Sequence, residues 1–285
     1  MQEVTAALAA LAARAVRVWT RPERLGTFAT IALVLVVWAL VLKVTRSRWP
    51  SPDRDDATDA MYTAFYVGGF FGFLIGGPLY ALVTRAIHVG APGLELHLLR
   101  GKPGWLQFLV LSVVTDFVSY GWHRWAHANR FLWLFHRIHH SQPHLTPLTN
   151  YRFHAGDIAF RGLLQAVPVA MLGADVSWFV AAIWIETALN LLAHSDFDWG
   201  YGPAGFLLVS PRFHRIHHAA EPGPARKNFG FLLAVWDHVF GTADGGAGRP
   251  ARYGVEGEAV PRAFLPQQID PFGAALRQVR GGARP

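Results

Sequence analysis

Long stretches without a charged side chain constrain the fold of this chain more than any other feature. Leu25 to Leu42 contains no charge before Lys43, which is long enough to cross a hydrocarbon core of about 30 Å as a helix. Further apolar runs cover Met61 to Thr84, Trp105 to Tyr120 and Gly162 to Ala193. We therefore expect an all-α integral membrane protein with about 4–5 transmembrane helices.

The composition agrees with a membrane protein. Hydrophobic residues make up 52% of the 285 positions and charged residues only 16%, which is unusual for a soluble domain. The sequence contains no cysteine, which excludes disulfides, thiolate zinc sites, cysteine-held iron–sulfur clusters and a cysteine nucleophile. The formal net charge of +7 comes with arginines at the ends of apolar runs and in the tail. That placement fits anionic lipid headgroups, and we do not expect nucleic-acid binding.

Four regions are expected along the chain. Residues 1–24 form an amphipathic segment on the membrane surface, because Arg14 and Arg17 interrupt its apolar residues. Residues 25–103 hold the transmembrane helices that precede the catalytic region, which covers 104–242. Residues 243–285 are rich in glycine, arginine and proline, and we expect a loosely ordered surface tail.

Connections inside these regions follow from charge, proline and glycine. Arg46 to Asp59 is expected to be an exposed connection, and Gly90 to Gly104 a break between helices. In the second apolar run, Gly68, Gly72 and Gly76 recur every four residues, which suits close helix packing. A break near Gly173 to Asp175 predicts that the last run forms a helical hairpin.

Histidines recur at helical spacing in three boxes. His123 and His127 form HxxxH, and two HxxHH boxes follow, at His136, His139 and His140 and at His214, His217 and His218. Residues spaced by three or four share a helix face, so each box can direct its imidazoles to one point. The hexapeptide FHRIHH occurs twice, ending at His140 and at His218, which suggests two similar halves of one site.

Eight imidazoles are too many for a single metal ion, so two ions are implied. The helical domain that holds them is expected at the membrane surface. Imidazole suits iron, zinc, copper and nickel. His194 is expected to be a ninth ligand, because Glu186, Asn190 and His194 form a polar stripe on an apolar helix. Glu186 and Asn190 are candidates for a metal ligand or for an outer contact of one.

Two further sites are weighed in the same way. Asp116 and Tyr120 share a helix face with the first box, and we expect Asp116 to hydrogen-bond a ligand imidazole. His154 is either an outer ligand or a hydrogen-bonding group on the substrate side. The remaining histidines are assigned other roles: structural for His144 and His238, and interfacial for His88 and His97.

These motifs resemble the fatty acid hydroxylase and sterol desaturase superfamily. The similarity covers roughly Asp116 to Thr242. It includes DFVSYGWHRWAH from Asp116 to His127, which contains the first box, the run after the second box to Arg152 and His154, KNFG from Lys227 and WDHVFGT from Trp236. The chain departs from some members at Asn190, where they have a further histidine.

The resemblance implies a multi-pass membrane enzyme whose two iron ions, replaceable by zinc during purification, lie on the cytoplasmic side and activate O2. By that similarity the nine histidines above are the metal ligands, and the enzyme hydroxylates or desaturates a lipid. No HPGG heme-binding stretch of the cytochrome b5 type is present, so electrons are expected from a separate protein, either cytochrome b5-like or a ferredoxin with its reductase.

Two other functions stay open from the residues themselves. A membrane di-zinc hydrolase would also use histidines, although the usual carboxylate ligands and the H-E-x-x-H motif are missing. A non-catalytic membrane protein that binds or transports metal would need polar residues along several spans, which the apolar runs mostly lack. Lysine and arginine lie on both sides of the first run, so the orientation of the amino terminus stays undecided.

Overall fold

The structure is a computed structural model that describes residues 53–220, 227–246 and 248–280, together with seven positions between 32 and 43. Those seven positions are helical. The expected amphipathic segment 1–24 and most of the first apolar run lie outside the described residues.

The described part of the chain is helical throughout and contains no named strand, so the expectation of an all-α fold is confirmed there. Its elements are α3 (Arg54–Val67), the π-helix η1 (Gly72–Gly76), α4 (Gly77–Gly90), η2 (Pro92–Leu94), α5 (Gly104–Ala128), α6 (Arg130–His140), η3 (Pro147–Tyr151), α7 (Ala155–Leu172), α8 (Val176–Ala193), η4 (Gly202–Phe206), α9 (Pro211–His217), α10 (Val235–Val239) and α11 (Phe264–Arg280).

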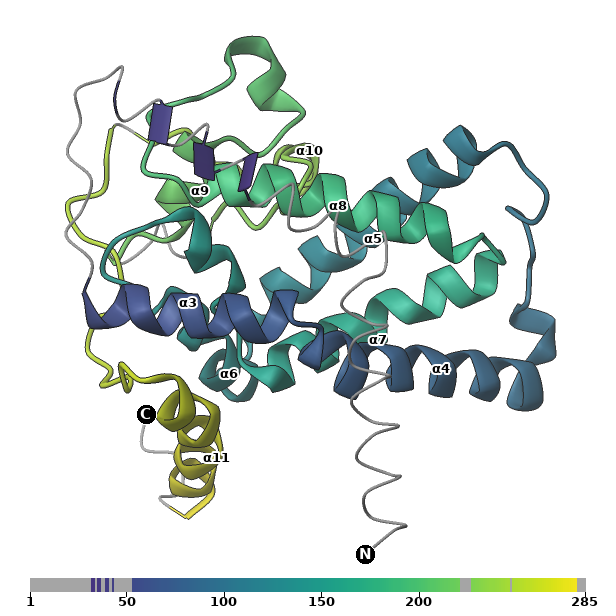
Figure 1. Cartoon of the computed structure of the whole chain (residues 1–285), viewed down its shortest axis with the longest axis horizontal. Coiled ribbons are helices and arrows are strands. Elements are labelled where there is room, and N and C mark those ends of the chain that lie inside the picture. Colours follow the sequence, from purple (N-terminus) through teal and green to yellow (C-terminus); the bar gives the residue numbers. More distant parts are fainter. Residues whose placement is uncertain are drawn as a thin grey trace, which may run out of the picture.

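Four helices, α4, α5, α7 and α8, lie together on one side of the molecule (Figure 1). The α4–α5 connection meets the end of α7, where the backbone N–H groups of His97 and Leu99 donate to Met171 O at 3.1 Å and Leu172 O at 3.0 Å. The predicted hairpin is present: α7 ends at Gly173, which adopts a left-handed φ of 64°, and Asp175 caps α8 through Ser177 N at 2.8 Å.

One described helix, Ala155–Leu172, is both long and apolar enough to cross a membrane, and Ser177–Ala193 is a shorter apolar helix. The predicted number of transmembrane helices is therefore neither confirmed nor excluded by the described residues.

Two expectations for the region before α5 are wrong. Met61 to Thr84 is not one helix, because the chain turns after α3 at Gly68 and Gly69, where Gly69 has a φ of 82°. Residues 54–59 are not an exposed connection, since they begin α3 and bury Asp55 and Asp59. Both carboxylates pair with the fully buried Arg152, which accounts for their burial.

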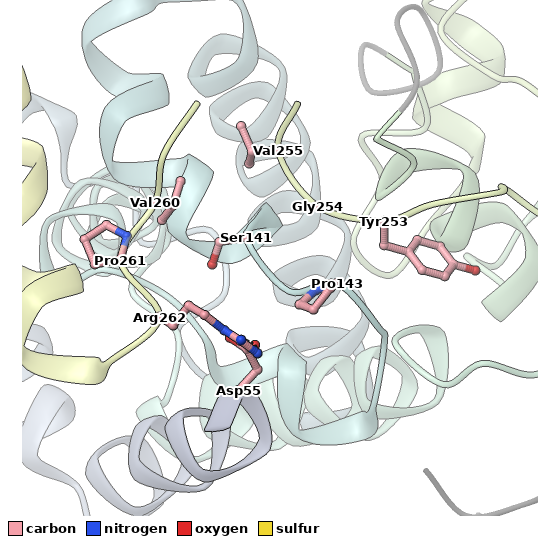
Figure 2. A pocket seen from close by; sticks show the side chains of 9 residues that line it. All are labelled: Asp55, Ser141, Pro143, Tyr253, Gly254, Val255, Val260, Pro261 and Arg262. Atoms are coloured by element: carbon pink, nitrogen blue, oxygen red, sulfur yellow. Dashed lines mark hydrogen bonds and ion pairs between the residues drawn. The ribbon is translucent and has the colours of Figure 1, made fainter. Parts of the chain in front are cut away.

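The expectation of a loosely ordered tail is also wrong, because residues 264–280 form α11, which packs against α6. The segment before α11 runs past Ser141, the residue after the second box. This segment and Ser141 line an open cavity of about 370 Å³. Figure 2 shows Arg262 reaching across this cavity to Asp55, whose Oδ2 accepts from Arg262 Nε at 2.7 Å. No histidine lines this cavity.

The first histidine box lies near the end of the long helix α5, and the second and third boxes lie at the ends of the short helices α6 and α9. Asn129 caps the start of α6 by accepting from Phe131 N and Leu132 N, both at 3.0 Å. Ser210 caps α9 in the same way through Phe213 N at 3.2 Å. Capping satisfies N–H groups that otherwise have no partner, so both copies of FHRIHH stand on short, well-defined helices.

Candidate metal centre

Nine histidines converge in two groups, and they are the nine that the sequence singled out as ligands. In the five-histidine group, one ring nitrogen of each residue lies within 4.8 Å of the others: His123, His127, His136, His140 and His217. The four-histidine group meets the same criterion: His139, His194, His214 and His218.

The two HxxHH boxes exchange their histidines between the groups. The second box sends its first and last histidines, His136 and His140, to the five-histidine group, and its middle one to the other. In the third box the assignment is reversed: the middle histidine, His217, belongs to the five-histidine group, and His214 and His218 belong to the four-histidine group. The repeated hexapeptide therefore builds two interlocked halves, as the repeat in the sequence suggested.

Short distances between ring nitrogens show that the imidazoles face common points. Nε2 of His214 lies 3.0 Å from Nε2 of His194 and 3.0 Å from Nε2 of His218. In the other group, His217 and His140 have their Nε2 atoms 3.1 Å apart. Nitrogens that each bind one ion at about 2.1 Å are separated by about this distance.

Hydrogen bonds on the far ring nitrogens fix the orientation of several imidazoles. Nδ1 donates to a backbone carbonyl in three of them, His123 to Phe229 O at 2.8 Å, His194 to Asn190 O at 2.8 Å and His217 to Lys227 O at 2.7 Å. A protonated Nδ1 leaves the lone pair of Nε2 available for a metal. Among the described residues His123 Nε2 is buried without a hydrogen-bond partner, and a buried nitrogen of this kind needs an explanation such as a bound metal ion.

Asp157 is an outer partner that the sequence reasoning missed. Its Oδ2 accepts from His136 Nδ1 at 2.6 Å and its Oδ1 from Trp122 Nε1 at 2.9 Å, and the side chain is buried. His136 Nε2 has no partner, so this is the carboxylate–histidine arrangement common beside metals. The sequence did contain a signal for Asp157, because it is an acidic residue in an apolar helix, and the same argument was applied to Asp116.

The loop after the third box supplies two of the orienting carbonyls, and the motifs of the resemblance hold it in place. Asp237 accepts from Phe229 N at 2.8 Å and from Gly230 N at 2.7 Å. Asn228, in a left-handed conformation with φ 59°, donates from Nδ2 to Phe213 O at 2.9 Å. KNFG and WDHVFGT are thus one scaffold for the imidazoles of His123 and His217.

Burial favours the neutral form of several of these histidines by lowering their pKa. It lowers the pKa of His194 to about 4 and that of His217 to about 3, and moves the pKa of His139, His140 and His218 well below the usual value. Neighbouring imidazoles lower the last three further by charge repulsion. Metal binding requires neutral imidazole, so the electrostatics suit a metal.

Asp116 takes a different role from the one expected. Among the described residues its carboxylate accepts from Leu232 N at 2.7 Å, Leu233 N at 3.1 Å and Trp236 Nε1 at 2.8 Å, and not from an imidazole. Tyr120 likewise bonds Thr242 Oγ1 at 2.9 Å. Both residues anchor α5 to the loop that orients His123.

Glu186 and Asn190 lie beside the histidine groups and line a small cavity. Asn190 orients His194 through its backbone carbonyl, while its side-chain Oδ1 is buried without a partner. Glu186 pairs with Arg161 at 3.4 Å, and that guanidinium lies 4.9 Å from the ring centre of Phe231. The cavity of about 50 Å³ is lined by residues including Tyr151, Phe153, Arg161, Glu186, Asn190 and Phe231.

Two aromatic rings separate this cavity from the histidines. Phe153 stacks on His139 with ring centres 4.1 Å apart, and Phe231 lies 5.0 Å from His123. The cavity therefore borders both groups, at the ends of the apolar hairpin α7–α8.

A larger cleft of about 1040 Å³ opens on the other side and reaches His127. Trp133 stands in it with its ring 5.1 Å from that of His127, and Arg124, Arg130 and Arg277 are among the lining residues.

The other histidines lie outside both groups. His154 caps α7, accepting from Gly156 N at 2.8 Å, and donates from Nε2 to Gln268 O at 3.0 Å. It therefore supports the helix that carries Asp157. The remaining histidines make other contacts: His144 contacts Asp56, His88 and His97 contact Glu95, and the ring of His238 stacks on that of Phe206.

The described fold and the two all-histidine groups are those of a helical histidine-box protein with two candidate metal sites. Comparison with known proteins narrows this class: residues 108–242 match the family model for fatty acid hydroxylase. Over this part of the chain, the resemblance to the fatty acid hydroxylase and sterol desaturase superfamily is confirmed.

Curated relatives agree. Ornithine lipid hydroxylase OlsE from Rhizobium tropici is 29% identical over 272 residues, which cover 94% of this chain and 80% of that protein. Alkylglycerol monooxygenase from Danio rerio is 31% identical over 138 residues, 48% of this chain and 30% of that protein. Very-long-chain aldehyde decarbonylase GL1-5 from Oryza sativa subsp. indica is 24% identical over 165 residues, 53% of this chain and 26% of that protein. No solved structure matches the chain.

The chain thus spans less than a third of the monooxygenase and the decarbonylase, but four-fifths of the hydroxylase. The enzyme class predicted from the sequence, an oxygen-dependent oxidoreductase acting on lipids, is confirmed by these relatives.

Proposed function

We propose that this protein is a di-iron membrane enzyme that hydroxylates a membrane lipid. The observation that carries the proposal is the pair of all-histidine groups that share two boxes and bring their Nε2 atoms to within about 3 Å of one another. Hydroxylation is favoured over desaturation because the relative that aligns with nearly the whole chain is a lipid hydroxylase.

The five-histidine and four-histidine groups would each hold one iron ion, with all nine histidines as ligands. Iron, together with dioxygen as co-substrate, would supply the oxidising power needed to break an unactivated C–H bond, which ordinary side chains lack. The protein's own residues fix the imidazoles: Asp157 orients His136, and backbone carbonyls orient His123, His194 and His217. Zinc can occupy the same nitrogen ligands during purification.

The lipid would approach from the side of α7 and α8. The cavity that borders both groups lies at that side, behind Phe153 and Phe231. Its volume admits only a short segment of a lipid, so the reacting carbon would enter while the rest stays among the apolar helices. The hydrogen-bonding groups of Asn190 and Tyr151 without partners favour a substrate with a polar group close to the reacting carbon.

Reducing equivalents would come from a separate protein. Dioxygen takes up four electrons on full reduction and a C–H bond supplies two, so two more are required for each turnover. The chain has no cysteine to hold an iron–sulfur cluster. We place the docking of a cytochrome b5-like protein or ferredoxin at the cleft beside His127, where Arg124 and Arg130 attract an acidic surface.

In this proposal the protein crosses the membrane several times, with about 4–5 helices and the metal centre on the cytoplasmic side. The apolar α7–α8 hairpin supports membrane insertion.

Lipid analysis tests the function. The chain and a His217→Ala variant are expressed in matched bacterial cultures that make ornithine lipids, under ¹⁸O₂. We expect a lipid class that gains one labelled oxygen atom in cells with the intact chain and not in cells with the variant. An unchanged lipid profile, in cells whose membranes contain the intact, iron-loaded protein, would contradict hydroxylation of the lipids present.

A further inference from the structure

Helix α11 has one face bound to the catalytic region, beyond the residues matched by the family model. Asp270 pairs with Arg137, which lies between His136 and His139 in the second box. Gln268 accepts from His154 through its backbone carbonyl and donates from Nε2 to Tyr62 at 2.9 Å. This inner face ties α11 to the helices that carry the metal centre.

The opposite face of α11 is apolar and exposed. Its five large side chains are 56% to 82% exposed: Leu265, Ile269, Phe272, Leu276 and Val279. Steps of four and three residues place all five on one narrow stripe of a helix. Isolated apolar residues are common on protein surfaces, whereas a contiguous stripe of this kind marks an interaction surface.

The stripe continues into the apolar surface of the preceding helices. Phe65 lies 4.7 Å from Phe264, at the start of α11, and 5.1 Å from Phe70, measured between ring centres. Phe70 and Leu74 are 49% and 64% exposed and lead on to α4, which packs on the apolar α7. One apolar surface therefore runs from α11 to the helices that we place in the membrane.

Charge at the end of α11 fits a lipid surface as well. Arg277 and Arg280 are both exposed in its last turn. Arg280 lies beside the stripe, whereas Arg277 lies toward Asp270, 3.7 Å away, at the edge of the cleft beside His127. Apolar residues on one face with arginines at its flank are typical of helices that lie in the headgroup region, where arginine is attracted to anionic lipids. In Figure 1, α11 lies at the outside of the molecule, apart from the four long helices.

We propose that α11 is an interfacial membrane helix, with its stripe in the acyl region of the bilayer and its arginines on anionic headgroups. The inference rests on the membrane location proposed above. Because Asp270 and Gln268 bind Arg137 and His154, a seated α11 would hold the second histidine box at a fixed depth relative to the lipid.

The absence of cysteine from the chain allows a direct test with single introduced thiols. Leu276→Cys and Val279→Cys place a label on the stripe, and Gln278→Cys is the matched control in the same turn, exposed and on the opposite face. Val167→Cys, on the exposed side of α7, reports membrane insertion of the hairpin. Each full-length variant carries the fluorophore NBD and is reconstituted at one chain per nanodisc, with phosphatidylglycerol and spin-labelled phosphatidylcholine.

We expect the stripe labels to show blue-shifted emission and strong quenching by the spin-labelled lipid, while the label at Gln278 keeps a water-like spectrum. Quenching at Val167 without quenching at either stripe position would overturn the inference and leave the proposed function intact. A water-like spectrum at Val167 as well would contradict the membrane location itself. Fluorescence changes at the stripe that appear only with two chains per disc would assign the stripe to a dimer contact and also overturn the inference.

Discussion

Replacing Asp157 by asparagine should weaken metal binding at one histidine group and spare the other. The carboxylate accepts two N–H groups, from His136 Nδ1 at 2.6 Å and Trp122 Nε1 at 2.9 Å. An amide has one acceptor oxygen, so one of these donors would face another donor in a buried site. His136 would lose the partner that fixes its tautomer and orientation.

The expected loss follows from that contact. Removing an outer partner of a metal-ligating histidine lowers metal affinity about 10–100-fold, which is about 1.4–2.7 kcal/mol. Asp157 bonds His136, a member of the five-histidine group, and among the described residues it accepts no hydrogen bond from the four-histidine group. The effect should therefore fall on the ion held by the five-histidine group.

Competition titration of metal-free protein with Fe²⁺ or Co²⁺ against a chelator, under anaerobic conditions, separates the two binding steps. Asp175→Asn is a matched control, because Asp175 is an exposed cap of α8 and asparagine caps a helix as well as aspartate does. Unchanged affinity in Asp157→Asn, or an equal loss at both steps, would refute this assignment of Asp157.

Two further predictions concern stability. In metal-free protein, the pKa of His194 is lowered to about 4 and that of His217 to about 3, below the unfolded value near 6.5, so the unfolded chain binds protons first as pH falls. Below about pH 6.5 the free energy of unfolding should fall by up to about 1.4 kcal/mol per pH unit for each histidine, and the melting temperature should fall with it. A melting temperature that stays flat down to pH 5 would contradict this. Arg152→Ala leaves the carboxylate of Asp59 buried without its cation and removes one of the two arginines that pair with Asp55. The loss should cost about 3–5 kcal/mol in the free energy of unfolding and detach α3, as denaturant titration can measure.

The nine histidines that converge could be identified from the sequence, because metal sites use specific side chains and the boxes place histidines at helical spacing. Their partition into two groups could not be predicted, since it depends on how α6 and α9 are placed relative to one another in the fold. Likewise, the carbonyls of Phe229 and Lys227 orient His123 and His217 through atoms that every residue has. Their side chains carry no signal for this role.

Composition misled the prediction for the chain's end, where glycine, proline and arginine indicate disorder. Helix α11 forms because its inner face gains contacts with α6, including the Asp270–Arg137 pair. Tertiary packing also explains the buried acids of α3, because Arg152 lies far along the chain from Asp55 and Asp59. Sequence patterns describe local preference, and these features depend on distant partners.

The metal content of the detergent-purified protein tests the central claim most directly. Elemental analysis of the intact chain should find two iron ions per chain, or two ions of zinc that iron replaces on reconstitution. His139→Ala and His217→Ala remove one ligand from the four-histidine and five-histidine groups respectively, and each should lose metal mainly from its own group. A chain that binds no stoichiometric metal after iron reconstitution, or variants that keep full occupancy, would contradict a histidine-held di-iron centre.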